Sequence, residues 1–162
     1  MKTLLAILIL TSTCAYAQDH HRHGGRCSNA TLRGSYGFTI SGTRPTGPPP
    51  APLEAFIGVA ITNFDGQGNL TQTYGTSHGS INGDSSNDTG SGTYSINEDC
   101  SGTMTLNFTG KTPPVSLKLW IVVVDGGDQV NLVVMTPTPN GAPFPASNLT
   151  ASFGKKIKDF DD

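Results

Sequence analysis

The sequence predicts an all-β protein, an eight-stranded antiparallel up-and-down barrel, and three observations support this fold class. Glycine accounts for 20 of 162 residues and charged residues for only 14%, a composition that suits strands and tight turns better than helices. Apolar residues recur with a period of two in eight segments. Short glycine turns force neighbouring strands to be antiparallel, and closing the sheet removes both exposed edges. A two-sheet β-sandwich is the alternative fold.

The expected strands follow one another along the chain with turns and loops between them. They cover residues 34–42, 53–64, 69–81, 89–97, 103–110, 115–124, 129–137 and 148–157. In segment 53–64 both the odd-numbered and the even-numbered positions are mostly apolar, so this strand is predicted to present apolar side chains on both faces. The proline-rich stretches 44–52 and 138–147 are predicted loops, and the polar stretch 82–88 is predicted to be a linker without a strand.

The first 17 residues have the features of a secretory signal peptide. Lys2 is followed by the apolar run 4–10, and an A-Y-A cleavage sequence ends at Ala17. The predicted domain organisation is therefore a signal peptide at 1–17, a disordered His-rich segment at 18–26, a barrel domain at 27–157 and a charged tail at 158–162. We expect a secreted or periplasmic protein with no membrane span after cleavage.

Cysteine usage agrees with export. Cys14 is removed with the signal peptide, which leaves Cys27 and Cys100 for one intramolecular disulfide in an oxidising compartment. Closing a loop of roughly 70 residues stabilises a fold by about 4 kcal/mol in the chain-entropy treatment.

The formal charge of -2 gives no reason to expect nucleic acid or an anionic membrane surface as a partner. The loop that begins at Asp65 places oxygen-bearing side chains at alternate positions, as a calcium loop does. It lacks the glycine at position six and the glutamate at position twelve that an EF-hand needs. We predict a hairpin turn, in which the Asp65 carboxylate binds backbone amides.

The predicted mature N-terminus is the best candidate for a metal site. Cleavage after Ala17 places His20 at position three, where an amine, two amides and an imidazole can bind Cu(II) or Ni(II), and His21 and His23 lie beside it. A solvated tail is the ordinary alternative for such a segment. No other cofactor is expected.

No catalytic residue can be assigned from the sequence. His78 lies in a Gly/Ser-rich stretch, and no G-x-S-x-G motif is present. The acidic residues, Glu54 among them, fall at strand ends and turns, where solvated carboxylates are usual.

The residues expected inside the barrel are large and mostly aromatic. As candidate ligand contacts they are Tyr36, Phe38, Tyr94, Met104, Leu106, Phe108 and Trp120. Filling the core is the alternative role for each of them.

Three stretches carry a resemblance to a known group. The sequences CSNATLRGSYGF (27–38), FDGQGNLT (64–71) and GTYSINEDCSGTMTL (92–106) resemble a group of uncharacterised secreted bacterial proteins, for which no activity is established. More distantly, the pattern is similar to allene oxide cyclase and dirigent barrels and to lipocalin-like calycins. Gly34 and Tyr36 lie where lipocalins have their G-x-W motif, with tyrosine in place of tryptophan. These resemblances imply a fold only.

The expected function is that of an exported, non-enzymatic barrel that binds a small apolar ligand or interacts with a component of the cell envelope. The alternative is an enzyme of the allene oxide cyclase or dirigent type that acts on a reactive apolar substrate. A fully packed interior would exclude both pocket functions. A cavity with a buried carboxylate would favour the enzyme, and an apolar cavity the carrier.

Overall fold

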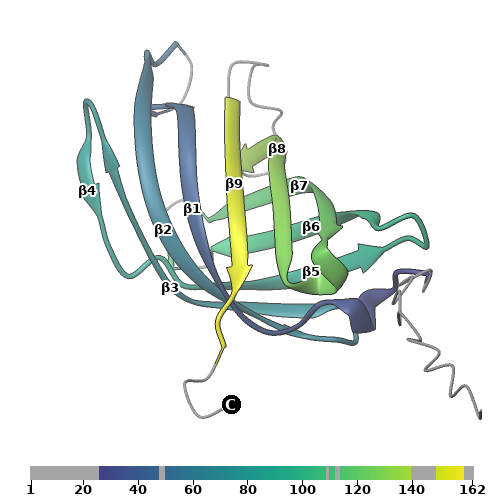
Figure 1. Cartoon of the computed structure of the whole chain (residues 1–162). Coiled ribbons are helices and arrows are strands. Elements are labelled where there is room, and N and C mark those ends of the chain that lie inside the picture. Colours follow the sequence, from purple (N-terminus) through teal and green to yellow (C-terminus); the bar gives the residue numbers. More distant parts are fainter. Residues whose placement is uncertain (1–25, 48–49, 109, 112–113, 140–148, 159–162) are drawn as a thin grey trace, which may run out of the picture.

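The computed structural model describes residues 26–47, 50–108, 110–111, 114–139 and 149–158, and it contains nine strands and two short 3-10 turns (Figure 1). The strands are β1 (Arg33–Pro45), β2 (Leu53–Asp65), β3 (Asn69–Gly79), β4 (Gly83–Ser85), β5 (Gly90–Ile96), β6 (Ser101–Phe108), β7 (Val115–Val124), β8 (Gln129–Pro139) and β9 (Leu149–Lys156). The 3-10 turns are η1 (Asn29–Thr31) and η2 (Asp125–Gly127).

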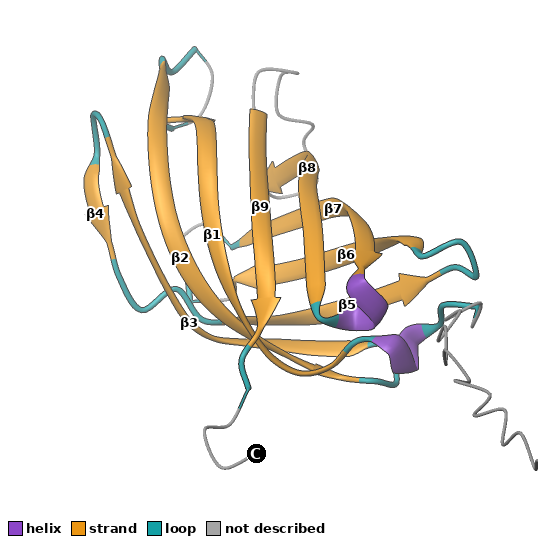
Figure 2. Cartoon of the chain, in the orientation of Figure 1, coloured by secondary structure: helices purple, strands orange, loops and turns teal. Residues whose placement is uncertain are grey.

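Eight of the strands close into an antiparallel barrel, which confirms the predicted fold over the sandwich. The sheet order is β2-β1-β9-β8-β7-β6-β5-β3-β4, and an additional β2–β3 pairing closes the ring. Figure 2 shows β5, β6 and β7 crossing behind β8 and β9, while β4 lies outside the ring beside β3. Each barrel strand therefore pairs with the barrel strands before and after it in the chain, β3 with β5 across the intervening β4, and β9 returns to β1.

The prediction that 82–88 contains no strand is wrong. Residues Gly83–Ser85 form β4, which pairs with the last three residues of β3. The Thr76 hydroxyl donates to the Ser85 carbonyl over 2.8 Å. Because β4 contains no apolar residue, its pairing depends on these backbone and hydroxyl contacts, which hydrophobic periodicity cannot reveal.

One end of the barrel, here called the floor, is closed by packed side chains. Leu32, Tyr36 and Phe64 are fully buried there. The Phe64 ring makes edge contacts with the Tyr36 and Tyr94 rings at centroid distances of 5.3 and 5.1 Å. Edge-to-face packing of this kind is favoured by the quadrupoles of the rings.

The disulfide between Cys27 and Cys100 is present, as predicted, with a Cα–Cα distance of 4.9 Å. It joins the segment that precedes η1 to the turn between β5 and β6. The Cys27 amide also donates to the carbonyl of Glu98 in that turn over 3.1 Å. The disulfide and this hydrogen bond therefore attach the N-terminal segment to the floor.

The hairpin between β2 and β3 confirms that the Asp65 loop is a structural turn. One carboxylate oxygen of Asp65 accepts the amides of Gln67 and Asn69 at 2.7 and 2.9 Å. The Asn69 side-chain amide donates to the second oxygen at 2.7 Å. These hydrogen bonds lower the pKa of the Asp65 carboxyl, with the Asn69 side chain contributing most.

The apolar residues of β2 are divided between its two faces, as predicted, but most of them point outward. Ile57, Val59 and Ile61 are exposed, whereas Thr62 and Phe64 are buried. In a strand with a period of two, the buried Phe64 ring fixes the parity of every other side chain. Among the described residues, no helix is long and apolar enough to cross a membrane.

Candidate functional site

The half of the barrel opposite the floor contains a cavity of about 320 Å³. Its wall is mainly apolar and comes from several strands: Phe38 and Ile40 of β1, Met104 and Leu106 of β6, and Leu119 and Leu132 of β7 and β8. Cavities of roughly this size hold small ligands in other proteins. The interior is therefore packed at the floor and hollow toward the other end, here called the mouth.

The predicted interior residues separate into three groups. Phe38, Met104, Leu106 and Phe108 line the cavity. Tyr36 and Tyr94 are buried in the floor and are not part of the cavity wall. Trp120 is the exception, because it lies outside the barrel.

Trp120 points into solvent with 59% of its surface exposed, so the prediction of an interior position is wrong. In β7 the inward residues are Leu119, Ile121 and Val123, all buried. The sequence did indicate the outward position of Trp120. Lys118, two residues earlier, lies on the same face of the strand, and a lysine rarely faces a core.

The two floor tyrosines act as structural hydrogen-bonding groups. The Tyr36 hydroxyl donates to the carbonyl of Gly127, and burial, assisted by the negative charge of Asp128, raises its pKa to about 12. The Tyr94 hydroxyl donates to the carbonyl of Leu32 at 2.9 Å and accepts the amide of Gly66 at 3.0 Å. Burial raises the Tyr94 pKa as well. Neither hydroxyl is placed to act on a molecule in the cavity.

Glu54 is buried, so the expectation that its carboxylate is solvated is wrong. The Arg44 guanidinium contacts it at 2.7 Å. The amides of Ile81 and Asn82, in the turn between β3 and β4, donate to its second oxygen at 3.1 and 2.9 Å. These hydrogen bonds, the Asn82 amide first, lower the Glu54 pKa to about 2. The carboxylate is an anchor for the mouth and does not line the cavity.

The segment between β4 and β5 closes the side of the cavity. β3 pairs with β5 only from Asn69 to Gln72, and beyond that point it pairs with β4. Asp88 lies in the resulting gap, where its amide donates to Gly75 at 2.9 Å and its carboxylate contacts the Lys111 ammonium. The ammonium also donates to Ser85 at 3.0 Å.

Among the polar residues of the cavity wall, none of which was predicted as a ligand contact, two lie next to each other. Thr62 on β2 and Gln72 on β3 are 3% and 6% exposed, and both line the cavity. They face each other as paired residues of the two strands. Because Thr62 is two residues before the buried Phe64, strand alternation would have placed it inside. Alternation from the buried Leu70 would likewise have placed Gln72 inside, because the bulge in the β2–β3 pairing falls after Gln72 along β3.

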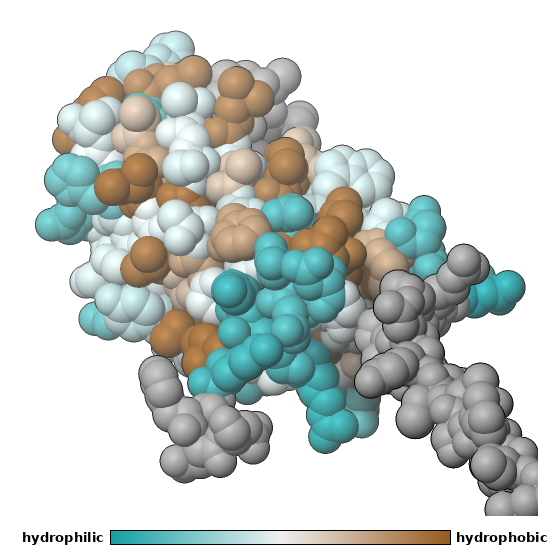
Figure 3. Space-filling model, in the orientation of Figure 1, coloured by the Kyte–Doolittle hydropathy of each residue, from teal (hydrophilic) through white to brown (hydrophobic). Residues whose placement is uncertain are grey.

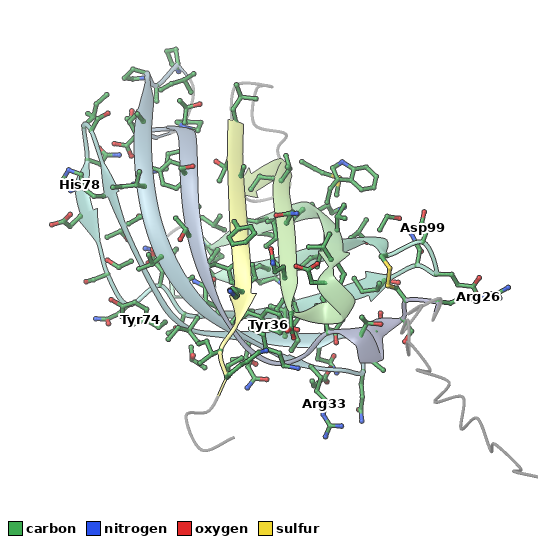
Figure 4. The ribbon with its side chains drawn as sticks, viewed as in Figure 1. Arg26, Arg33, Tyr36, Tyr74, His78 and Asp99 are labelled. Atoms are coloured by element: carbon green, nitrogen blue, oxygen red, sulfur yellow. A yellow bond between two sulfur atoms is a disulfide. The ribbon has the colours of Figure 1, made fainter. Side chains whose placement is uncertain are left out.

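Of the four histidines, the structure describes His78. His78 contacts Asp84 at 2.6 Å on the exposed outer side of β3 and β4 (Figure 4). No group of three or more metal-binding side chains occurs among the described residues. His20, His21 and His23 lie outside the described residues.

The outer wall of the barrel also has exposed apolar side chains. Figure 3 shows them on the side of β1, β2 and β9 as brown groups separated by paler and polar residues. Ile57 and Val59 of β2 and Phe153 of β9 belong to this set. Serine and threonine occupy the outward positions of β1 between them.

No protein-family model matches the chain, and comparison with curated proteins found no match.

Proposed function

We propose that the protein is an exported carrier that binds one small, mainly apolar molecule inside the barrel. The observation that carries this proposal is the cavity of about 320 Å³ with a wall of phenylalanine, leucine, isoleucine and methionine side chains. Water in such a cavity has few polar partners, so an apolar ligand that replaces it gains the hydrophobic free energy of its own surface. Export is part of the proposal and is supported by the disulfide.

The charged groups around the cavity favour a carrier over the cyclase-type or dirigent-type enzyme. A general acid needs a pKa near the working pH, and the hydrogen bonds from the Asn82 amide and from Arg44 lower the pKa of Glu54 to about 2. Asp88 does line the cavity, but its carboxylate is engaged by Lys111 and by the Ser85 hydroxyl at 2.9 Å. Each of these carboxylates holds two segments of the mouth together.

Native mass spectrometry of the protein purified gently from its own host tests the proposal. The test compares wild type with Ala60→Phe, which places a ring inside the cavity beside Phe38 and Gly75. Ala151→Phe is the matched control, because Ala151 is exposed on the outer side of β9. We expect a bound molecule of defined mass on wild type and on the control, and none on Ala60→Phe.

Three other results would contradict the proposal. Wild-type protein without any bound molecule would favour the role at the cell envelope, which would use the outer wall. A bound molecule that persists in Ala60→Phe and is lost in Ala151→Phe would place binding on that wall. Turnover of the released molecule by wild type would favour the enzyme.

A further inference from the structure

We propose that the cavity selects an uncharged molecule of about ten non-hydrogen atoms with one hydroxyl or carbonyl group, which Thr62 and Gln72 bind. This inference rests on the proposed carrier function and names its ligand class. The size follows from the volume of about 320 Å³, since one water occupies roughly 30 Å³ of liquid and a carbon or oxygen atom of a ligand takes a similar share.

The Thr62 hydroxyl is available to a ligand. No other described residue forms a hydrogen bond with it, although the side chain is almost completely buried. No fully enclosed polar side-chain atom is left unpaired in the described part of the chain, so the hydroxyl must face the open cavity. A buried hydroxyl without a partner costs free energy, and a polar ligand group removes this cost.

The Gln72 amide is held in place beside it. Its nitrogen donates to the backbone carbonyl of Asp88 at 2.7 Å, which leaves its carbonyl oxygen for other partners. This arrangement requires glycine at position 75, because a Cβ there would lie 2.5 Å from the Gln72 nitrogen and 2.7 Å from the Asp88 oxygen. The pair thus offers a hydroxyl that donates and accepts next to a fixed amide.

The charges at the mouth argue against a carboxylate ligand. Arg44 and Lys111 are the cations of the cavity wall, and they are already paired with Glu54 and Asp88. An anionic head would have to compete with these contacts or face the carboxylate of Asp88, which lines the cavity. A neutral polar group meets no such competition.

Isothermal titration calorimetry with three probes of similar size tests this inference. The probes are 1-nonanol, nonanoate and propylbenzene, at neutral pH. Thr62→Val removes the hydroxyl at nearly constant volume, Thr62→Ser retains it, and Gln72→Leu removes the amide. We expect Thr62→Val and Gln72→Leu each to weaken 1-nonanol binding by about twofold to tenfold, as loss of one hydrogen bond does, and to leave propylbenzene within twofold. Thr62→Ser should bind 1-nonanol as wild type does.

Ser152→Ala tests whether another hydroxyl of the cavity wall, rather than that of Thr62, binds the polar group of the ligand. Ser152 lines the wall on β9, and β1 separates it from Thr62. Loss of 1-nonanol binding in Ser152→Ala instead of Thr62→Val would overturn the inference, and so would tighter binding of nonanoate than of 1-nonanol. Equal effects of all variants on 1-nonanol and propylbenzene would also overturn it. Thermal denaturation of each variant verifies folding, and Gln72→Leu provides a second measurement if Thr62→Val does not fold.

The inference and the proposed function fail in different ways. If wild type binds none of the probes but leaves its host with a bound molecule, the ligand class is wrong and the carrier function stands. If wild type binds no probe and carries no molecule from its host, both are wrong.

Discussion

Removal of the disulfide by Cys27→Ser together with Cys100→Ser should lower stability by an amount that the structure allows us to estimate. The two cysteines are 73 residues apart. The loop-closure entropy for that length corresponds to about 4 kcal/mol at 25 °C. This is a large fraction of the roughly 5–15 kcal/mol that stabilises an ordinary domain.

The variant should still fold, because other contacts hold the N-terminal segment on the floor. The Asn29 side chain accepts the amide of Ile96 at 2.8 Å, and Leu32 is fully buried. The barrel strands themselves contain neither cysteine. The loss should therefore appear in the free energy of unfolding, with the far-ultraviolet circular dichroism of the native state unchanged.

Urea denaturation followed by circular dichroism measures this loss. The matched control is wild type treated with a reductant, which should lose the same free energy as the double variant. A loss below about 1 kcal/mol in both samples would refute the entropic reasoning. A loss in the double variant alone would show that the serine side chains, rather than the missing bond, cause the effect.

Two further predictions concern the charged and polar anchors of the barrel. The pKa of Glu54 is lowered from 4.5 to about 2. The contribution of the Glu54 carboxylate to the free energy of unfolding should therefore be complete above pH 4.5 and be lost as the pH falls toward 2. Glu54→Gln should remove this part of the pH dependence, as measured by urea denaturation. The same dependence of the free energy of unfolding on pH between pH 5 and 2 in wild type and Glu54→Gln would contradict this stabilising role of Glu54. Tyr94→Phe should cost about 1–3 kcal/mol, because it leaves the Gly66 amide and the Leu32 carbonyl without their shared partner, and a thermal denaturation curve unchanged from wild type would argue against it.

The fold could be predicted because the apolar periodicity and the turn residues agree along most of the chain. The segments expected around Tyr36 and Met104 form strands with these residues inside, and the Asp65 loop is the expected turn. Both depend on local rules, namely strand alternation and the ability of an aspartate to bind the next backbone amides.

The site was harder to predict because it depends on partners that are distant in the sequence. Glu54 is buried only because Arg44 and the amides of Ile81 and Asn82 surround it, and no local pattern brings these together. The Gln72 amide is fixed only because the backbone carbonyl of Asp88, in the segment between β4 and β5, accepts its hydrogen bond. The cavity itself could not be predicted, because strand alternation indicates which side chains point inward but not how completely they fill the interior.

The most direct test of the carrier function is to locate a bound molecule by nuclear Overhauser effects between 1-nonanol and assigned methyl groups of the wild-type protein. Binding inside the barrel predicts effects to Met104 and Leu106, which line the cavity, and none to Val122 or Val133, which are exposed on the outer wall. Effects to Val122 and Val133 without effects to Met104 and Leu106 would contradict the account.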